Sequence, residues 1–333
     1  MDRRAFLGFA LAAAATPLSC TRPSGVPGTV RIGFLANVTH APMIVALASG
    51  AIARALPGVT VETRTFRAGP RVCEALLGNA IDIGVSGPGP LVATHARHTG
   101  DPFALLSGVA SGGASLITLP WVKSAHDLAG TRVSTPQIGS TQDISLRKWL
   151  ARNGLVTKER GGDVVVDAMA SSNVMEQMRR GRIAAAWLPE PWATRVVVDL
   201  GATRMLDERE LWSERRFPTA LLVARRPFLD ARRRDVDAVV VAVQQAIARA
   251  TRDPSTKVTT FAEIKRLTGK GLPPGVADAA WSRVDFAADP MPAAIAEIAR
   301  DAFDLGYVPR ADVNGLVAQS VQPMPKLPSS AVF

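Results

Sequence analysis

Cysteine, tyrosine and histidine are all scarce in this chain. Its 333 residues include two cysteines, Cys20 and Cys73, one tyrosine and four histidines, and 20% of the residues are charged. Two cysteines cannot form a disulfide framework, so we expect the apolar core alone to hold the fold. Beyond the N-terminus no run reaches the 18 or so apolar residues of a membrane span, which predicts a domain that is soluble or merely tethered.

The usual signatures of enzymes and metal sites are also missing. His95 and His98 have no Cys, Glu or third His nearby to complete a metal set. Residues 269–271, Gly-Lys-Gly, lack the rest of a phosphate-binding loop, and no G-x-S-x-G turn occurs. Cys73 lies within an apolar helical pattern, where a reactive thiolate is not expected. We therefore predict no catalytic residue, no metal and no cofactor.

Apolar residues and positive charge are what the sequence has in quantity. Its length and 47% hydrophobic composition exceed one comfortable core and predict two lobes. The net charge of +10 comes mostly from arginines spread along the chain, with 232–234 the longest run. Nucleic-acid binding would need a clustered basic stripe, and spread arginines argue against one. A membrane surface or anionic solutes remain as candidate acidic partners.

The N-terminus has the order of an export signal. Paired arginines precede the apolar run 6–15, and Leu18-Ser19-Cys20 follows. The arginine pair is typical of the twin-arginine variant, which leaves the choice between Sec and twin-arginine export open. Leu18–Cys20 resembles a lipobox, in which Cys20 becomes the lipidated first residue; the alternative is an ordinary residue near a conventional cleavage site. We predict a signal over 1–20 and a linker over 21–28.

The rest of the chain alternates strands and helices, and the pattern repeats. A first β-α-β-α-β unit is predicted from strands at 29–35, 59–65 and 80–86 and helices at 41–56 and 71–77. A second is predicted from strands at 131–134, 163–167 and 183–188 and helices at 142–153 and 174–180. The repetition predicts two similar α/β lobes with parallel sheets.

The two lobes need connections between them. Ala114–Leu119 and Thr219–Ala224 are the candidate crossover strands, and four helices at 236–251, 260–268, 276–284 and 292–306 are expected to return to the first lobe. The predicted division is 29–118 plus 217–310 for lobe 1, 119–216 for lobe 2 and 311–333 for a C-terminal tail. Ligands of such sheets bind beyond the carboxyl ends of the strands, where helices begin.

Residues 134–143, STPQIGSTQD, are one such helix start. Ser140-x-x-Asp143 has the form of a capping box, which is one interpretation of the whole stretch. The other interpretation adds that Gly139 lets a ligand approach the backbone, so that free N–H groups and the hydroxyls of Ser140 and Thr141 hold a sulfonate, carboxylate or nitrate. Asp143 would then have to turn its carboxylate aside.

Other turns offer weaker signals. Ser86-Gly-Pro-Gly-Pro90 fails as a dinucleotide fingerprint, because its prolines are expected to block a following helix. Ser111-Gly112-Gly113 could approach a ligand or be a flexible turn. At the first β–α turn, Asn37, Thr39 and His40 could meet an anion, or His40 could be an ordinary cap or packing residue. Trp187 is predicted to lie in the core, and Trp192 either closes over a small ligand or packs in the core.

Taken in order, several stretches resemble the nitrate/sulfonate/taurine group of solute-binding proteins from bacterial ABC importers, in particular the aliphatic-sulfonate-binding members. The stretches are Arg31–Phe34 with Asn37–Pro42, Ala75–Pro90, Asp127–Val133 with Pro136–Asp143, and Ala186–Trp192. The resemblance covers residues 29 to 310.

This resemblance implies a type II periplasmic-binding fold whose two lobes close around a solute and then dock on a permease with its ATPase. It implies that no catalysis is needed. With the N-terminal signal and the spread of charge, we expect a monomer that is exported, lipid-anchored and does not bind nucleic acid. The ligand-binding residues expected on this basis are Asn37, Thr39, His40, Ser86, Gly87, Ser111, Gly112, Ser140, Thr141, Gln142, Glu190 and Trp192. Glu190 would lie at the rim or contact an amine, and no arginine can be assigned to a sulfonate.

Two other functions stay open. A binding protein of the same fold could capture a neutral or cationic heterocycle such as a pyrimidine precursor, with Trp192 stacking and Glu190 accepting hydrogen bonds. A related fold also serves enzymes of thiamine-pyrimidine and menaquinone synthesis, but the pyrimidine synthases carry a cysteine cluster that this sequence lacks.

Overall fold

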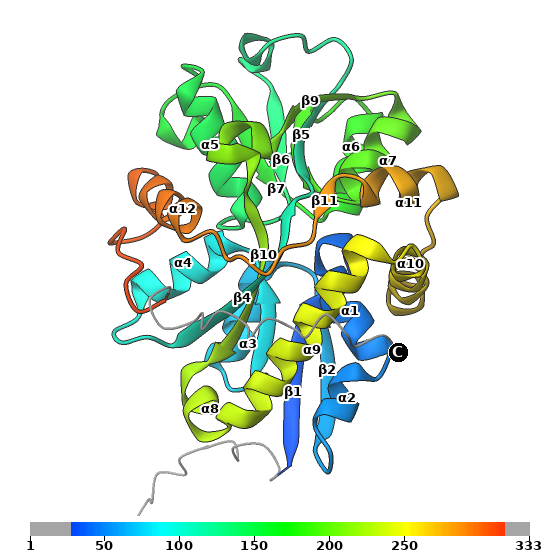
Figure 1. Ribbon diagram of the computed structural model, residues 1–333. Coiled ribbons are helices and arrows are strands. Elements are labelled where there is room, and N and C mark those ends of the chain that lie inside the picture. Colours follow the sequence, from blue (N-terminus) through cyan, green and yellow to red (C-terminus); the bar gives the residue numbers. More distant parts are fainter. Residues whose placement is uncertain (1–27, 317–333) are drawn as a thin grey trace, which may run out of the picture.

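The computed structural model describes residues 28–316. The predicted signal, Cys20 and most of the predicted linker lie outside these residues, as does most of the predicted tail. Two sheets, each covered by helices, form two lobes one above the other (Figure 1). The two-lobed α/β fold predicted from the sequence is therefore confirmed. Within 28–316, no helix combines the length and the apolar character needed to cross a membrane.

The first lobe is built on a six-stranded sheet in the order β11-β4-β10-β3-β1-β2. Its strands are β1 (Thr29–Leu35), β2 (Thr60–Phe66), β3 (Ile83–Ser86), β4 (Phe103–Gly112), β10 (Pro218–Arg225) and β11 (Val284–Asp285). β1 pairs in parallel with β2 and β3, whereas β10 runs antiparallel to β3 and β4.

Helices cover both faces of this sheet because each face carries its own apolar cluster. One cluster takes buried residues from α1 (Ala41–Ala48), α2 (Ala51–Ala55), α9 (Arg233–Arg252) and α10 (Ser255–Thr268). The other takes them from α3 (Gly69–Leu77), α4 (Pro88–Arg97) and α12 (Pro292–Asp304). The C-terminal helix α12 therefore belongs to the core of the first lobe.

The second lobe has a five-stranded sheet in the order β7-β6-β8-β5-β9. Its elements are β5 (Ala114–Thr118), β6 (Arg132–Thr135), β7 (Val165–Ala168), β8 (Ala185–Pro189), β9 (Thr203–Asp207), α5 (Thr141–Arg152), α6 (Ser171–Arg179) and α7 (Trp192–Leu200). Trp187 on β8 is fully buried, which confirms its predicted place in the core.

Shorter elements complete the described chain. They are α8 (Arg226–Ala231), α11 (Pro274–Trp281) and the 3₁₀ turns η1 (Val38–His40), η2 (Ala125–Leu128), η3 (Lys158–Arg160), η4 (Glu208–Leu211) and η5 (Ser213–Arg215).

Both sheets are mixed, which corrects the expectation of parallel sheets. β5 lies antiparallel to β8 and β9, and β10 is antiparallel to its neighbours. The reason is the crossing of the chain between lobes: a strand that arrives from the other sheet does not follow the βα alternation that makes strands parallel. β4 passes through Gly113 directly into β5, so 114–118 pair within the second sheet, whereas the predicted boundary counted them with lobe 1.

Two predicted helices, and one turn after which no helix was predicted, differ from the structure. The predicted helix 41–56 is two helices, because Gly50 between them is left-handed with φ 70°. A helix does follow Gly87, since prolines in a first helical turn remove N–H groups that have no partner inside the helix. The predicted helix 276–284 ends at Trp281, and α11 packs on α7 of the second lobe before the chain returns through β11.

Candidate functional site

The start of α5 is a capped helix terminus, as its sequence predicted. Ser140 has extended backbone angles, and its hydroxyl accepts from the Asp143 N–H at 3.3 Å. Ser140 is 3% exposed, and its own N–H donates to the Gln137 carbonyl. The serine hydroxyl is therefore part of the helix cap.

Asp143 has turned its carboxylate away from the first N–H groups of the helix. It accepts from the Gly139 N–H at 2.9 Å, the Thr135 hydroxyl at 3.2 Å, Arg147 Nε at 3.0 Å and the Tyr307 hydroxyl at 2.8 Å. Asp143 is fully buried, and the guanidinium of Arg147 compensates its charge.

What remains at this terminus is a pair of backbone donors. The N–H groups of Thr141 and Gln142 have no acceptor among residues 28–316, and neither does the side-chain amide of Gln142. Such groups, together with the helix dipole, favour an anion.

The start of α4 lies directly against the start of α5. The Gly89 N–H donates to the Thr141 hydroxyl at 3.1 Å. A Cβ on Gly87 would come within 2.4 Å of the Thr141 hydroxyl, and one on Gly89 within 2.9 Å of the Thr141 Cα. The structure therefore brings two of the predicted site residues, Gly87 and Thr141, into contact across the two lobes.

Two further serines of the predicted site have protein partners. Ser86 is fully buried, and its hydroxyl donates to the Gly69 carbonyl at 3.3 Å. The hydroxyl of Ser111 accepts from the Phe217 N–H at 3.1 Å. The Gly112 carbonyl accepts from the Thr219 hydroxyl. Ser86 therefore links β3 to α3 within the first lobe, and Ser111 and Gly112 link β4 to the segment that begins β10. A role of these residues in binding solute remains a prediction.

The first β–α turn is held by internal hydrogen bonds and carries no charge. Asn37 caps η1 by accepting from the Thr39 N–H and hydroxyl, both at 2.8 Å. His40 is buried, which lowers its pKa to about 3, so the ring is neutral at physiological pH. Its Nδ1 accepts from the Leu35 N–H at 3.3 Å, which places the proton on Nε2. His40 is thus no cation and no pH sensor, but it can donate a hydrogen bond.

Glu190 and Trp192 have roles inside the second lobe. Glu190 is fully buried rather than at a rim; it accepts from the Thr194 N–H at 3.0 Å and from Arg204 at 2.8 Å. Burial raises the pKa of Glu190, although Arg204 opposes the shift. Trp192 is partly buried against the apolar cluster around α7, and Arg195 lies 5.4 Å from the centre of its ring.

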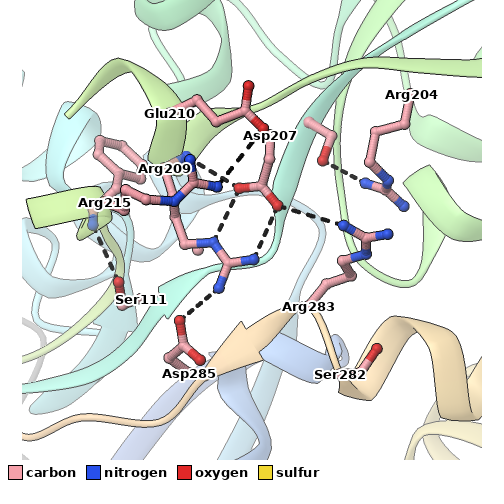
Figure 2. A network of polar contacts seen from close by, with 12 residues as sticks. Ser111, Arg204, Asp207, Arg209, Glu210, Arg215, Ser282, Arg283 and Asp285 are labelled. Carbon is pink, nitrogen blue, oxygen red and sulfur yellow. Dashed lines mark hydrogen bonds and ion pairs between the residues drawn. The ribbon is translucent and has the colours of Figure 1, made fainter.

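A second polar network joins the lobes near the crossing strands (Figure 2). Arg209 contacts Asp207 of β9 through Nε and Nη2, both at 3.0 Å, and Asp285 of β11 through Nη1 at 2.6 Å. Arg283 approaches Asp207 at 3.9 Å. A Cβ on Gly112 would lie 2.7 Å from the Arg209 Cδ. The arginine nearest this predicted site residue is therefore already paired with carboxylates from both lobes.

Sequence and structure comparisons agree on one group of proteins. The model of the NMT1-like family matches residues 25–264. The chain belongs to the NMT1-like family. A protein of Brucella abortus that carries the provisional name of a binding protein is 27% identical over 276 residues, 82% of each chain.

Solved structures show the same fold. The alkanesulfonate-binding protein SsuA from Xanthomonas axonopodis pv. citri, bound to MOPS, has a TM-score of 0.73 at 21% identity and covers 88% of this chain and 98% of its own. The periplasmic nitrate-binding protein NrtA from Synechocystis PCC 6803 has a TM-score of 0.71 at 17% identity, covering 85% and 82%. These confirm the predicted type II periplasmic-binding fold, and the Brucella relative is named as a binding protein, not as an enzyme.

Sequence reasoning missed several residues that this NMT1-like chain places around the site. Arg209 and Asp207 lie in the charged stretch 207–216, and its mixture of acids and bases is typical of a solvated surface. Tyr307 lies just after the last predicted helix. Its one signal was that the chain has no other tyrosine.

Glu208 is another group that sequence reasoning missed. It is fully buried, and its carboxylate accepts from the Ser145 hydroxyl of α5 and from Trp187 Nε1 at 3.0 Å. Burial raises its pKa to about 7. Within 28–316, no group of three or more His, Cys, Asp or Glu is arranged to hold a metal ion.

Proposed function

We propose that this protein is the solute-binding component of an ABC importer and that it captures a small anion, of the aliphatic-sulfonate or taurine type, by closure of its two lobes. The observation that carries the proposal is the start of α5. Two N–H groups, of Thr141 and Gln142, have no acceptor in the described part of the chain and lie where α4 of the other lobe touches α5, and Asp143 has turned aside.

The distribution of charge supports an anion over a cation. The helix dipole adds positive potential at Thr141 and Gln142, and the neutral His40 can donate without adding charge. The carboxylates that would attract a cation are Glu190, Asp207 and Asp285, and each is paired with an arginine. The two solute-binding proteins of the same fold are named for alkanesulfonate and for nitrate, both anions.

The partners and location follow from the same proposal. A protein that captures solute for an importer works outside the cytoplasmic membrane, in the periplasm or on the membrane's outer face, and delivers to a permease driven by an ATPase. The export signal and lipidation at Cys20 predicted from the sequence would hold it there.

The heterocycle alternative has less support. Its two recognition groups were Glu190 and Trp192. The Glu190 carboxylate is already engaged by Arg204 and by the Thr194 N–H, so a ligand would have to displace an arginine from a buried carboxylate. That exchange would cost several kcal/mol.

A ligand panel tests the proposal. We expect millimolar alkanesulfonates or taurine to raise the unfolding temperature of the purified protein, because a ligand at 100 times its Kd stabilises the fold by about 2.7 kcal/mol. Nitrate and bicarbonate form a second set of anions, and a pyrimidine forms the comparison ligand. A rise with the pyrimidine alone would favour the alternative, and no rise with any anion would refute the proposal. Mass spectrometry of ligand carried through purification would identify the natural solute.

A further inference from the structure

Ionic contacts between α5 and α12 join the two lobes independently of any solute. α12 packs its apolar side into the core of the first lobe, through Ile295, Ile298 and Ala299. Its opposite side carries acids that face α5 of the second lobe. Lys148 of α5 lies 2.9 Å from Asp301 and 2.8 Å from Asp304.

A second basic residue extends the same contact along the helices. Arg152, one turn further along α5, lies 3.3 Å from Glu297 and 3.8 Å from Asp301. Asp301 is 7% exposed, so water screens its attraction to Lys148 and Arg152 less than in a surface pair. We call Lys148, Arg152, Glu297, Asp301 and Asp304 the α5–α12 seam.

Tyr307 adds a hydrogen bond between the lobes next to this seam. It follows α12, and its hydroxyl donates to the buried Asp143 carboxylate at 2.8 Å. Arg147, which pairs with Asp143, lies 5.7 Å from the centre of the Tyr307 ring. A hydrogen bond to a carboxylate is stronger than one between neutral groups. Nearby, Arg160 of η3 donates to the Leu305 carbonyl at 2.5 Å, a further bond between the lobes.

We propose that the α5–α12 seam and the Tyr307–Asp143 hydrogen bond are a latch that closes the lobes before solute arrives, so that Lys148 and Tyr307 are positioning residues for solute capture. The proposal rests on capture by lobe closure, the proposed function. All the charges of the latch belong to this chain, and none of its contacts involves Thr141 or Gln142, the groups proposed to meet the solute. Separation of the lobes would have to break every contact of the latch at once.

The latch changes what a solute has to do. In an open protein, the solute must supply the free energy that brings the lobes together. With the latch, part of that free energy comes from ion pairs and one hydrogen bond within the chain. The closed form is therefore populated before solute binds, and the affinity for solute rises in proportion to the closed fraction. High salt should weaken the seam because it screens partly exposed charges.

Small-angle X-ray scattering of the unliganded protein tests the latch. We expect wild type at low salt to give the radius of gyration of this closed structure, and Lys148→Ala and Tyr307→Phe each to expand it. Loss of the Tyr307 hydroxyl should shift the open-to-closed ratio about tenfold. Lys148→Arg should remain closed because it keeps the charge. Arg233→Ala is the matched control, since it removes an ion pair with Asp237 inside α9 of one lobe.

The single tyrosine provides a second reading of the same contact. Burial raises the pKa of Tyr307, and the charge of Asp143 raises it further. Tyrosinate absorbance should therefore develop at higher pH in wild type than in Lys148→Ala, where the lobes separate and the hydroxyl meets water. Circular dichroism would show that each variant is folded.

The outcomes separate the latch from the proposed function. Wild type that is already open, variants as compact as wild type, or an equal expansion in Arg233→Ala would each overturn the latch, whatever the protein binds. If the wild type is closed but binds none of the anions, the proposed function is refuted, whereas the scattering result still supports closure by the latch. Where an anion does bind, Lys148→Ala should weaken its affinity in proportion to the expansion.

Discussion

The starts of α4 and α5 are the same kind of element, a strand end leading into a helix, and they face each other from opposite lobes. They differ in what they offer. Pro88 and Pro90 leave the first turn of α4 with a single N–H, on Gly89, and Thr141 accepts from it. Among residues 28–316, the N–H groups of Thr141 and Gln142 at the start of α5 have no acceptor. In the proposed function, the first start allows close approach and the second receives the anion.

The two starts are also held in place differently. The prolines, with their fixed φ, and the apolar cluster around Leu91 hold α4. α5 is fixed by buried carboxylates, Asp143 at its first turn and Glu208 against Ser145. In the proposed function, the first lobe therefore provides close contact and the second provides polar recognition, and three substitutions test this difference.

Gly89→Ala should have the largest effect, because it targets the contact. The added Cβ would lie 2.9 Å from the Thr141 Cα and 3.0 Å from the Thr141 N, which are backbone atoms of the other lobe. We expect about a hundredfold loss of anion affinity by calorimetry, since overpacking of this kind costs about 3 kcal/mol.

The matched control for Gly89→Ala is Gly275→Ala. Gly275 also follows a proline at a helix start, and a Cβ there meets nothing within 4 Å. Gly275→Ala should not lower the stability of the unliganded protein, because alanine favours a helix. Unchanged affinity in Gly89→Ala would show that α4 does not need to approach α5.

Glu208→Gln should have the next largest effect, and only at higher pH. Burial raises the pKa of Glu208 to about 7 from an ordinary 4.5, so the folded protein holds a proton that the unfolded chain releases between those values. Stability from this group is therefore complete at low pH and is lost as pH rises to 7. Glutamine stays neutral, so Glu208→Gln should be more stable than wild type by about 2 kcal/mol at pH 8 and nearly equal to it at pH 5.

Denaturant unfolding at several pH values measures this difference. Glu62→Gln, an exposed position on β2, is the control and should follow the wild-type profile. A Glu208→Gln profile parallel to wild type would mean that Glu208 is ionised in the fold and that the support of α5 is not pH-dependent.

Much of the scaffold followed from the sequence because it depends on local patterns. The strand 29–35 was predicted at its observed bounds, and α5 and α6 were placed within three residues at each end. The sequence pattern did not predict β4 or the two-residue β11. Neither has a periodic signal of its own, because each is a strand only through its pairing with neighbouring strands.

The sequence could suggest candidate residues for the site but not their bonding. The stretch 139–142 was identified because a helix start at a strand end has a sequence signature, whereas the helix after Gly87 was not expected, and binding of solute at either place stays a prediction. Sequence alone could not show that Ser86 donates to Gly69 or that Asp143 accepts from Tyr307, 164 residues away. Such partners are set by the packing of distant segments.

Ser140→Ala should have the smallest effect of the three. Its hydroxyl caps α5, whereas α4 has no side-chain cap, so only the α5 terminus should be sensitive. We expect a loss of about 1 kcal/mol in the free energy of unfolding, measured with denaturant. Ser282→Ala, at the C-terminal end of α11, is the control and should change stability by less than about 0.5 kcal/mol. An equal loss in both variants would contradict a specific cap.

The most direct measurement is amide NMR of the protein labelled with nitrogen-15, titrated with an alkanesulfonate that binds. If the start of α5 holds the anion, the N–H resonances of Thr141 and Gln142 should shift the most, with that of Gly89 moving little because its acceptor is Thr141. Saturation of binding without a shift at Thr141 and Gln142 would contradict the account and place the anion elsewhere.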